Sequence, residues 1–282
     1  MNIAPERVNP TSLEVSKTRV FNPFSSAASA AAMPAIPDPA MTMSYLSISH
    51  AHAYIGKLLF RTVAGNQFKF NSDEITRVIE LMSTQSPPHH FEFHDPFWVL
   101  ITTMLSHRTK DQVTDAASRK LFERYDGISG LASASVDDVV KIIDKVGFKN
   151  MKAPRIIEAA KIIRDKYGGK VPGSLDELTK IPGVGRKTAN VVLSDSFGIP
   201  AIAVDTHVQR ISRRMGICLS DDPEETEEAI MKIVPRDLWV GLNPMMVEFG
   251  KKICKPIGPL CRECSVSRYC AYFHDQVEKK SV

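Results

Sequence analysis

A lysine and an aspartate in the middle of the chain carry the side chains that nucleophilic catalysis needs. Lys187 lies two residues after Gly185, where the first turn of a helix is expected. The partial positive charge of a helix N-terminus disfavours an ammonium group, and burial in a cleft lowers the pKa of a lysine further. A neutral amine can attack an electrophilic carbon and form a Schiff base. An isolated helix lysine is usually an ordinary surface residue, so the interpretation depends on its neighbours.

Asp205 is the second candidate, and it stands at the start of another expected helix. The apolar residues 202–204 precede it, and Val208 and Ile211 follow at helical spacing. An aspartate at this point is a good N-cap, which is its structural explanation. Capping and catalysis are compatible, because a cap places the carboxylate at a helix tip that faces a cleft. There it could stabilise positive charge that develops on a sugar ring, or help to move protons.

The segment around Lys187 predicts a helix-hairpin-helix over residues 174–197. Its turn contains two glycines, which permit backbone angles closed to other residues and let a phosphate approach main-chain amides. Those amides stand at the N-terminus of the second helix, which favours binding of a nucleic-acid backbone without reading of its sequence. A plain helix corner would explain Gly-x-Gly alone, but the string L-x-x-I-P-G-V-G-x-K-T-A favours the hairpin. The expected DNA contacts are Gly183, Val184, Gly185 and Arg186.

Four of the five cysteines fall within the last 30 residues, with the spacing C-x6-C-x2-C-x5-C. A local cluster at the end of a large chain indicates a reducing compartment and a metal or cluster site. Zinc is one alternative, although zinc sites typically pair two C-x2-C motifs and this segment has one. Four thiolates also hold iron–sulfur clusters. The candidate ligands are Cys254, Cys261, Cys264 and Cys270, whereas Cys218 stands apart as an ordinary core or surface residue.

Charge is unevenly distributed along the chain. The 36 Lys and Arg exceed the 32 Asp and Glu by only four, so net charge alone is a weak indication of an anionic partner. Two basic groups flank the expected cleft, and such groups favour phosphate neutralisation over the usual solvated surface. The acidic run at 221–228 is expected on a helix start that faces solvent, away from DNA. The basic residues are Arg210, Arg213, Arg214, Lys251, Lys252, Lys255, Arg262 and Arg268.

The elements that position these residues are expected to be helices throughout. From Asn71 onward apolar residues recur at helical spacing, as in residues 73–84 and 152–167, and no convincing alternating strand is found. N-caps are expected at Asp95, Ser135 and Ser174, and Gly147 is expected to end a helix. With 43% apolar and 24% charged residues the composition is globular, and no apolar run approaches the roughly 18 residues that span a bilayer.

The first 70 residues differ from the rest. Residues 25–40 are mainly Ser, Ala and Pro, which have little to bury and cannot offset the entropy of ordering. We expect residues 1–70 to be a poorly ordered extension without an assigned function, apart from one short helix or strand at residues 54–60. The extension lacks the continuous apolar segment of a signal peptide.

Residues 178–190 and 202–210 resemble the two signature segments of the endonuclease III family, and the cysteine spacing resembles that family's [4Fe–4S] loop. The resemblance runs from about Asn71 to about Phe273. It implies an all-α, two-lobed helix-hairpin-helix DNA glycosylase fold with a C-terminal iron–sulfur cluster loop. It also implies a bifunctional DNA glycosylase and abasic-site lyase, with Lys187 and Asp205 as its catalytic residues. Related adenine glycosylases lack this lysine, so its presence implies the lyase chemistry.

The implied reaction begins when a damaged base is flipped out of the duplex. Lys187 then displaces the base at the sugar C1′, Asp205 assists, and β-elimination from the Schiff base nicks the strand. The usual substrates of the family are oxidised or ring-damaged pyrimidines in double-stranded DNA. Two alternatives stay open from the sequence: a mismatch uracil or thymine glycosylase of the same fold, and a non-catalytic DNA-binding module whose cluster senses redox state.

One loop departs from the family pattern. Residues 104–116 resemble the family's MLS-x-Q-T-K-D-Q-V-T segment, but Arg108 replaces the glutamine and follows His107. In relatives this loop contacts DNA near the flipped nucleotide, and an arginine can both stack and hydrogen-bond there, so what stays open is the base preference. Further expected DNA contacts are His107, Arg108, His207, Arg210 and Lys255.

The resemblance also predicts how the chain is divided. Residues 95–216 form a helical barrel lobe that bears the hairpin, residues 71–94 plus 217–273 form the cluster lobe, and residues 274–282 are a tail. DNA would lie across the cleft between the lobes. We expect a monomer without membrane association, located in the cytoplasm of a prokaryote or in the nucleus or mitochondrion of a eukaryote.

Overall fold

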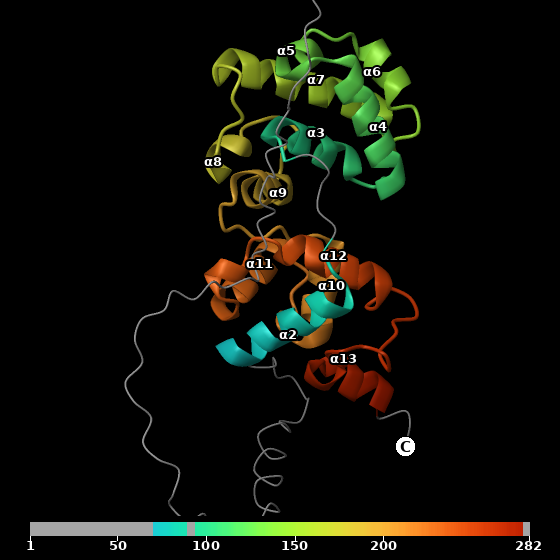
Figure 1. Cartoon of the computed structure of the whole chain (residues 1–282), viewed down its shortest axis with the longest axis vertical. Coiled ribbons are helices and arrows are strands. Elements are labelled where there is room, and N and C mark those ends of the chain that lie inside the picture. Colours follow the sequence, from blue (N-terminus) through green and yellow to red (C-terminus); the bar gives the residue numbers. More distant parts are fainter. Residues whose placement is uncertain (1–69, 89–93, 279–282) are drawn as a thin grey trace, which may run out of the picture. The chain divides into compact units, whose positions relative to one another are not determined.

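The computed structural model describes residues 70–88 and 94–278, and all regular structure within those ranges is helical. The all-α prediction is therefore confirmed (Figure 1). The short element expected at residues 54–60 lies outside the described residues. Within them, no helix is both long enough and apolar enough to cross a membrane. The α-helices are α2 (Ser72–Gln85), α3 (Pro96–Ser106), α4 (Asp111–Arg124), α5 (Gly127–Ala132), α6 (Val136–Ile142), α7 (Lys149–Lys166), α8 (Leu175–Leu178), α9 (Arg186–Phe197), α10 (Thr206–Met215), α11 (Pro223–Ile233), α12 (Leu242–Lys252) and α13 (Ala271–Phe273).

Helix starts follow the capping residues in the sequence. Asp95 accepts hydrogen bonds from the N–H groups of Phe97 and Trp98 at the start of α3, with Pro96 in the first turn. Ser135 and Ser174 accept from the third residue of α6 and α8 in the same way. These predicted caps are confirmed, since each satisfies N–H groups that have no partner inside the helix.

Gly147 does not end a helix, so that prediction is wrong. Helix α6 ends at Ile142, five residues earlier. A Cβ at Gly147 would stand 2.7 Å from the carbonyl oxygen of Arg108, which is closer than real Cβ atoms come to backbone. The glycine is needed because the two backbones approach each other closely, and a partner 39 positions away leaves no trace in the local sequence.

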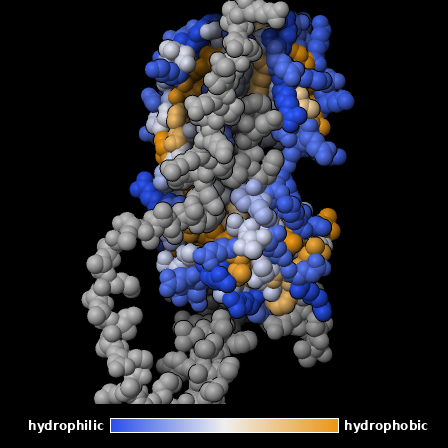
Figure 2. Space-filling model, viewed as in Figure 1, coloured by the Kyte–Doolittle hydropathy of each residue, from blue (hydrophilic) through white to orange (hydrophobic). Residues whose placement is uncertain are grey.

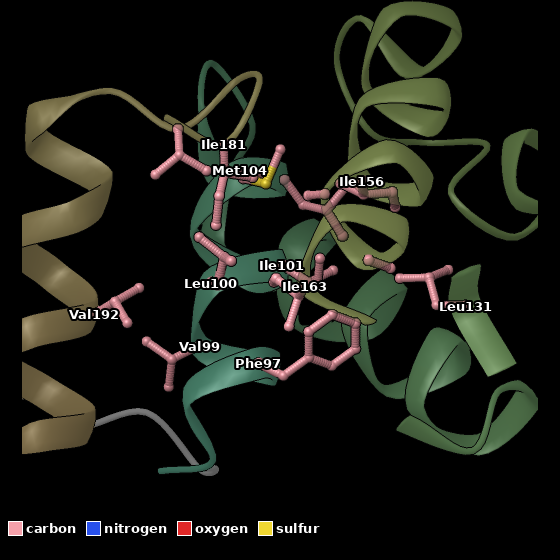
Figure 3. Close-up of a cluster of buried hydrophobic side chains, with 14 of the residues drawn as sticks. Phe97, Val99, Leu100, Ile101, Met104, Leu131, Ile156, Ile163, Ile181 and Val192 are labelled. Carbon is pink, nitrogen blue, oxygen red and sulfur yellow. The ribbon is translucent and has the colours of Figure 1, made fainter. Parts of the chain in front are cut away.

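The first hydrophobic core surrounds α3. Eight of the 11 residues of α3 are buried, because the helix packs against α4, α7 and α9. Figure 3 shows Leu100 and Ile101 of α3 among side chains from α7 and α9, including Ile156, Ile163 and Val192. This core therefore fixes the N-terminus of α9, which carries Lys187, relative to α3.

The second core combines the beginning and the end of the described chain. Helix α2 packs against α12, and α12 packs against α10. The extended segment 201–204 alternates between the cores, since Ala201 and Ala203 face the first while Ile202 and Val204 face the second. Helix α10 contributes Val208, Ile211 and Met215 to the second core, although the predicted division placed residues 95–216 in one lobe. On the face in Figure 2, hydrophilic residues cover most of the coloured surface.

Candidate active site and DNA-binding surface

Lys187 and Asp205 line the same cleft, which has a volume of about 480 Å³. Lys187 is the second residue of α9, and its side chain is largely withdrawn from solvent. Asp205 is the N-cap of α10, and its Oδ1 accepts hydrogen bonds from the N–H groups of His207 and Val208, both at 2.9 Å. The structure thus brings together the two candidates from the first turn of one helix and the cap of another.

The electrostatics of the cleft favour the neutral amine of Lys187. Burial lowers the pKa of Lys187 from its ordinary value, because the ammonium loses hydration, while the nearby carboxylate of Asp205 acts in the opposite direction. The N-terminus of α9 adds partial positive charge on the same side. A lysine with a depressed pKa in a cleft can act as a nucleophile near neutral pH.

Other polar groups of the cleft fix its walls. Asn243 of α12 donates a hydrogen bond to the carbonyl oxygen of Ala203 at 2.7 Å, which holds the segment before Asp205. Lys251 of α12 bridges to Asp111 at the start of α4, at 2.5 Å, and to Glu248 at 3.0 Å. These contacts tie α12 of the second core to α4 of the first. They also mean that Lys251, one of the basic residues counted for phosphate, is engaged within the protein.

The hairpin turn exposes the main-chain groups expected to meet a phosphate. Gly183 has φ +82°, a left-handed conformation that favours glycine. Val184 is buried as the hydrophobic anchor of the turn, whereas Gly183 and Gly185 are exposed. Gly185 is the N-cap of α9 and has no side chain to accept from the first-turn N–H groups. Those donors stand at the positive end of the helix dipole, an arrangement that binds anions.

Arg186 is engaged with a residue that we expected to face solvent. Its guanidinium forms two hydrogen bonds to Glu227 of α11, at 2.8 and 3.0 Å. Glu227 is only 4% exposed, so the prediction that the whole acidic run 221–228 faces solvent is wrong at this residue. A buried carboxylate is tolerated because it is paired. A DNA contact by Arg186 stays a prediction.

The loop after α3 and the segment just before α7 each hold one residue in an unusual conformation. Arg108 and Phe148 have φ of +52° and +59°, in the left-handed region that side chains rarely adopt. They contact each other, with the guanidinium carbon of Arg108 5.6 Å from the ring centre of Phe148. Phe148 is 53% exposed, which makes this pair an aromatic and cationic surface next to the hairpin. Sequence reasoning found Arg108 and missed Phe148, whose exposure has no local signal.

Lys152 of α7 holds the loop after α3 through hydrogen bonds. Its Nζ donates hydrogen bonds to the carbonyl oxygens of Leu105 and His107, each at 2.6 Å, and to Oγ1 of Thr109 at 3.1 Å. The lysine is 8% exposed and satisfies the carbonyl groups at the C-terminus of α3. Sequence reasoning did not identify Lys152. The sequence does contain one indication of its role, which is a lysine at the start of the apolar face of a helix.

His107 lies between the loop and α9. Its Nε2 is 3.3 Å from Oγ1 of Thr188, the residue after Lys187. Burial, and then the positive charges of Lys187 and Lys152, lower the pKa of His107 to about 4. A histidine held neutral in this way adds no charge beside Lys187. Its predicted contact with DNA stays a prediction.

The arginines of α10 point toward the cysteine segment. Arg210 donates to the carbonyl oxygens of Cys254 and Gly250, at 3.0 and 3.1 Å, and contacts Nδ1 of His207 at 3.1 Å. Arg214 donates to the carbonyl oxygens of Lys255 and Pro256. These guanidinium groups therefore anchor the loop after α12. Phosphate contacts by Arg210, His207 and Lys255 stay predictions, and Arg213 forms an ion pair with Asp221.

The four C-terminal cysteines line one pocket beneath that loop, together with Arg214 and apolar side chains. None of them forms a disulfide. Burial is the main cause that raises the pKa of Cys264 to about 11 and that of Cys270 to about 12, with a smaller contribution from neighbouring cysteines. No three His, Cys, Asp or Glu side chains of the described ranges stand close enough together to ligate one metal ion. The donor set of four thiols in a shared apolar pocket nevertheless fits an iron–sulfur cluster.

The fold and the site together define a class: helical DNA-binding proteins in which a hairpin presents a lysine to a cleft that also holds an aspartate. Residues 101–236 match the HhH-GPD superfamily of base excision DNA repair proteins. Endonuclease III of Thermotoga maritima is 52% identical over 186 residues, which cover 66% of this chain and 87% of that protein. Endonuclease III of Rickettsia felis is 35% identical over 208 residues, which cover 73% and 98%.

Comparison with solved structures indicates the same family. A trapped endonuclease III–DNA covalent intermediate is matched with a TM-score of 0.69 and 35% identity, over 76% of this chain and 100% of that chain. A thermostable thymine-DNA glycosylase is matched with a TM-score of 0.64 and 26% identity, over 71% and 94%. The chain belongs to the endonuclease III family. It is a DNA glycosylase and abasic-site lyase of base excision repair, as the sequence predicted.

Proposed function

We propose that this enzyme removes oxidised pyrimidines from duplex DNA with Lys187 as the nucleophile and Asp205 as its partner. The observation that carries the proposal is the withdrawn Lys187, with its depressed pKa, in the same cleft as Asp205. Of the lysines that burial affects, Lys152 is occupied by three hydrogen bonds and Lys251 by two ion pairs. Lys187 is therefore the best placed nucleophile in the cleft.

In the proposed reaction, Nζ of Lys187 forms a bond to C1′ while the bond from C1′ to the base breaks. The base leaves with the bonding electrons and takes up a proton, and Asp205 stabilises the positive charge on the sugar. Ring opening gives a Schiff base between Lys187 and C1′. A proton then leaves C2′, and the bond from C3′ to its phosphate oxygen breaks, which nicks the strand 3′ to the lesion.

The proposal assigns the DNA backbone to the hairpin amides around Gly183, Val184 and Gly185. It is supported by the exposed N-terminus of α9 and by the structural match to a non-covalent endonuclease III–DNA complex. Binding without base contacts at this position is expected to weaken as salt is raised. We further propose that the enzyme acts as a monomer, with DNA across the cleft that Lys187 and Asp205 line.

We propose that Cys254, Cys261, Cys264 and Cys270 hold a [4Fe–4S] cluster. When bound, the cluster supplies positive charge that keeps the four thiols deprotonated, and it ties their segment into one loop. The raised pKa values of Cys264 and Cys270 fit this role, because bare thiols in this pocket would stay protonated.

We also propose a cytoplasmic location. Relatives such as the Thermotoga maritima and Rickettsia felis proteins are bacterial, which supports this location.

Borohydride trapping tests the catalytic assignment. A duplex that contains an oxidised thymine is incubated with enzyme and borohydride, which reduces a Schiff base to a stable covalent complex. The native protein is expected to trap, and Lys187→Ala is expected not to. Lys161→Ala, on the exposed side of α7, is the matched control and is expected to trap like the native protein. Undiminished trapping by Lys187→Ala would overturn the assignment.

A panel of lesion duplexes tests the substrate. The similarity to a thymine-DNA glycosylase makes uracil and thymine mismatches the second candidate substrates. Faster single-turnover cleavage of oxidised pyrimidines than of either mismatch supports the proposal, and the reverse order would replace it with the mismatch activity.

A further inference from the structure

We propose that Glu227 is a positioning residue, which fixes Lys187 relative to Asp205 by binding the first turn of α9 and, through Asn190, the segment that leads to Asp205. The inference rests on the proposed function, because Lys187 is the group being positioned. Glu227 is the one member of the acidic run 221–228 that the structure buries deeply together with a cationic partner.

The contacts form a closed set. Both carboxylate oxygens of Glu227 accept from Arg186, with Oε2 bound by Nε at 2.8 Å and Oε1 by Nη2 at 3.0 Å. Oε1 also accepts from Nδ2 of Asn190 at 3.1 Å, and the same amide donates to the carbonyl oxygen of Ile202 at 2.9 Å. Asn190 is 2% exposed, so it has no water to replace these partners.

The set connects the two catalytic candidates through the backbone. Arg186 is the first residue of α9 and precedes Lys187 directly, while Ile202 lies three residues before Asp205. Helix α9 belongs to the first core, whereas Ile202 and the helix that carries Glu227 belong to the second. Glu227 thus joins the element that carries the amine to the element that carries the carboxylate. A misplacement of about 1 Å at a reacting group can cost about 100-fold in rate.

A purely structural role would have a different signature. If Glu227 only joined the cores, its loss would lower stability but leave the rate of each folded molecule unchanged. The ion pair between Arg186 and Glu227 also orients the two helices, because a bidentate guanidinium–carboxylate contact fixes direction and distance together. The Arg186 side chain is 41% exposed, so its charge stays hydrated when the partner is removed. Folded Glu227→Gln protein is therefore expected.

The test compares Glu227→Gln and Arg186→Lys with the native enzyme. The measured quantity is the single-turnover rate of borohydride trapping on a duplex with an abasic site, taken on the high-pH plateau, where Lys187 is neutral. Folded, DNA-competent enzyme is counted by titration with a duplex that holds a tetrahydrofuran abasic analogue, which cannot form a Schiff base. Glu228→Gln is the matched control, since that neighbour has a 70% exposed side chain that faces Lys232.

We expect both variants to trap at least tenfold more slowly per competent molecule, and the double variant to be no slower than the worse single variant. Glu228→Gln is expected to match the native rate. Native rates in both variants, or losses that multiply in the double variant, would overturn the positioning role. The proposed function would stand in that case, because the native enzyme would still trap. Absence of trapping by the native enzyme would overturn both. If Glu227→Gln does not fold, Arg186→Lys alone decides between the outcomes.

Discussion

Asp205 caps the helix that follows it with the same carboxylate that faces Lys187 across the cleft. Its Oδ1 accepts two main-chain hydrogen bonds of 2.9 Å, which fix the carboxylate at the tip of α10. The two residues lie at the N-termini of α9 and α10, and each helix packs in a different core. The catalytic geometry thus depends on the contact between the cores as much as on either residue.

Substitution of Asp205 separates its two roles. Asparagine caps a helix as well as aspartate does, so Asp205→Asn is expected to change the free energy of unfolding by less than about 0.5 kcal/mol. It removes the charge, and the single-turnover rate of base removal should fall about 100-fold. Asp205→Ala should lose the rate and about 1 kcal/mol of stability as well. Thermal unfolding and single-turnover kinetics give the two readings, and an Asn variant with native rate would exclude catalysis by the carboxylate.

The pH dependence of Schiff-base formation reports on Lys187. Because burial lowers the pKa of Lys187, the neutral amine should dominate at a lower pH than for a free lysine. The trapping rate is therefore expected to rise with pH and level off, with a midpoint below the ordinary value of 10.5. Asp205 raises this pKa, so the midpoint should move lower still in Asp205→Asn. A midpoint that moves upward in the variant would contradict the electrostatic account.

Loss of the Lys152 ammonium group is expected to lower both the free energy of unfolding and the rate of cleavage of lesion duplexes. Lys152→Met leaves the carbonyl oxygens of Leu105 and His107 without their donor, which is expected to cost about 1–3 kcal/mol of unfolding free energy. The loop that carries Arg108 should move, and cleavage of lesion duplexes should slow. Lys161→Met on the exposed side of α7 is expected to stay within about 0.5 kcal/mol of the native value. Equal stability of the two variants in urea unfolding would refute the capping role.

Alanine substitutions at Gly147 and Gly173 are expected to have different effects on stability, because only Gly147 lies close to another backbone segment. Gly147→Ala places a Cβ against the backbone oxygen of Arg108, so unfolding free energy should fall by about 1–3 kcal/mol. Gly173 has open space around it and an ordinary φ, and Gly173→Ala should be neutral or stabilising by up to about 1 kcal/mol. Chemical denaturation measures both. A Gly147→Ala protein as stable as the native one would show that the loop has room to shift.

Iron content tests the cysteine pocket. Purified native protein should contain about four irons per chain and absorb visible light as a cluster does. Cys264→Ser removes a ligand from the pocket and should lower the iron content, whereas Cys218→Ser replaces a buried cysteine outside the ligand set and should not. Metal analysis of the three proteins decides the matter. Zinc in place of iron, or equal iron in both variants, would reject the cluster assignment.

The features that could be predicted from sequence depend on neighbours in the chain. The caps at Asp95, Ser174 and Asp205 act on N–H groups two or three residues away, and the apolar faces of α2 and α7 repeat within each helix. The hairpin likewise lies within one short segment. Such features follow from local propensity and periodicity, which a single sequence contains.

The features that could not be predicted depend on distant partners. The acidic neighbours of Glu227 predict a side chain that faces solvent, whereas its partner Arg186 is 41 positions away. Lys152 is bound by carbonyl groups 45 and 47 positions away, and Gly147 is required by the backbone of Arg108. Only the packing of the helices brings these pairs together, and one sequence does not show which helices meet.

Mapping the trapped adduct tests the central assignment most directly. The borohydride-reduced complex is digested with a protease, and mass spectrometry locates the residue that carries the sugar remnant. We predict that the adduct lies on Lys187 and on no other amine. An adduct on another lysine, or on the chain's N-terminal amine, would contradict the assignment even if the enzyme cleaves damaged DNA.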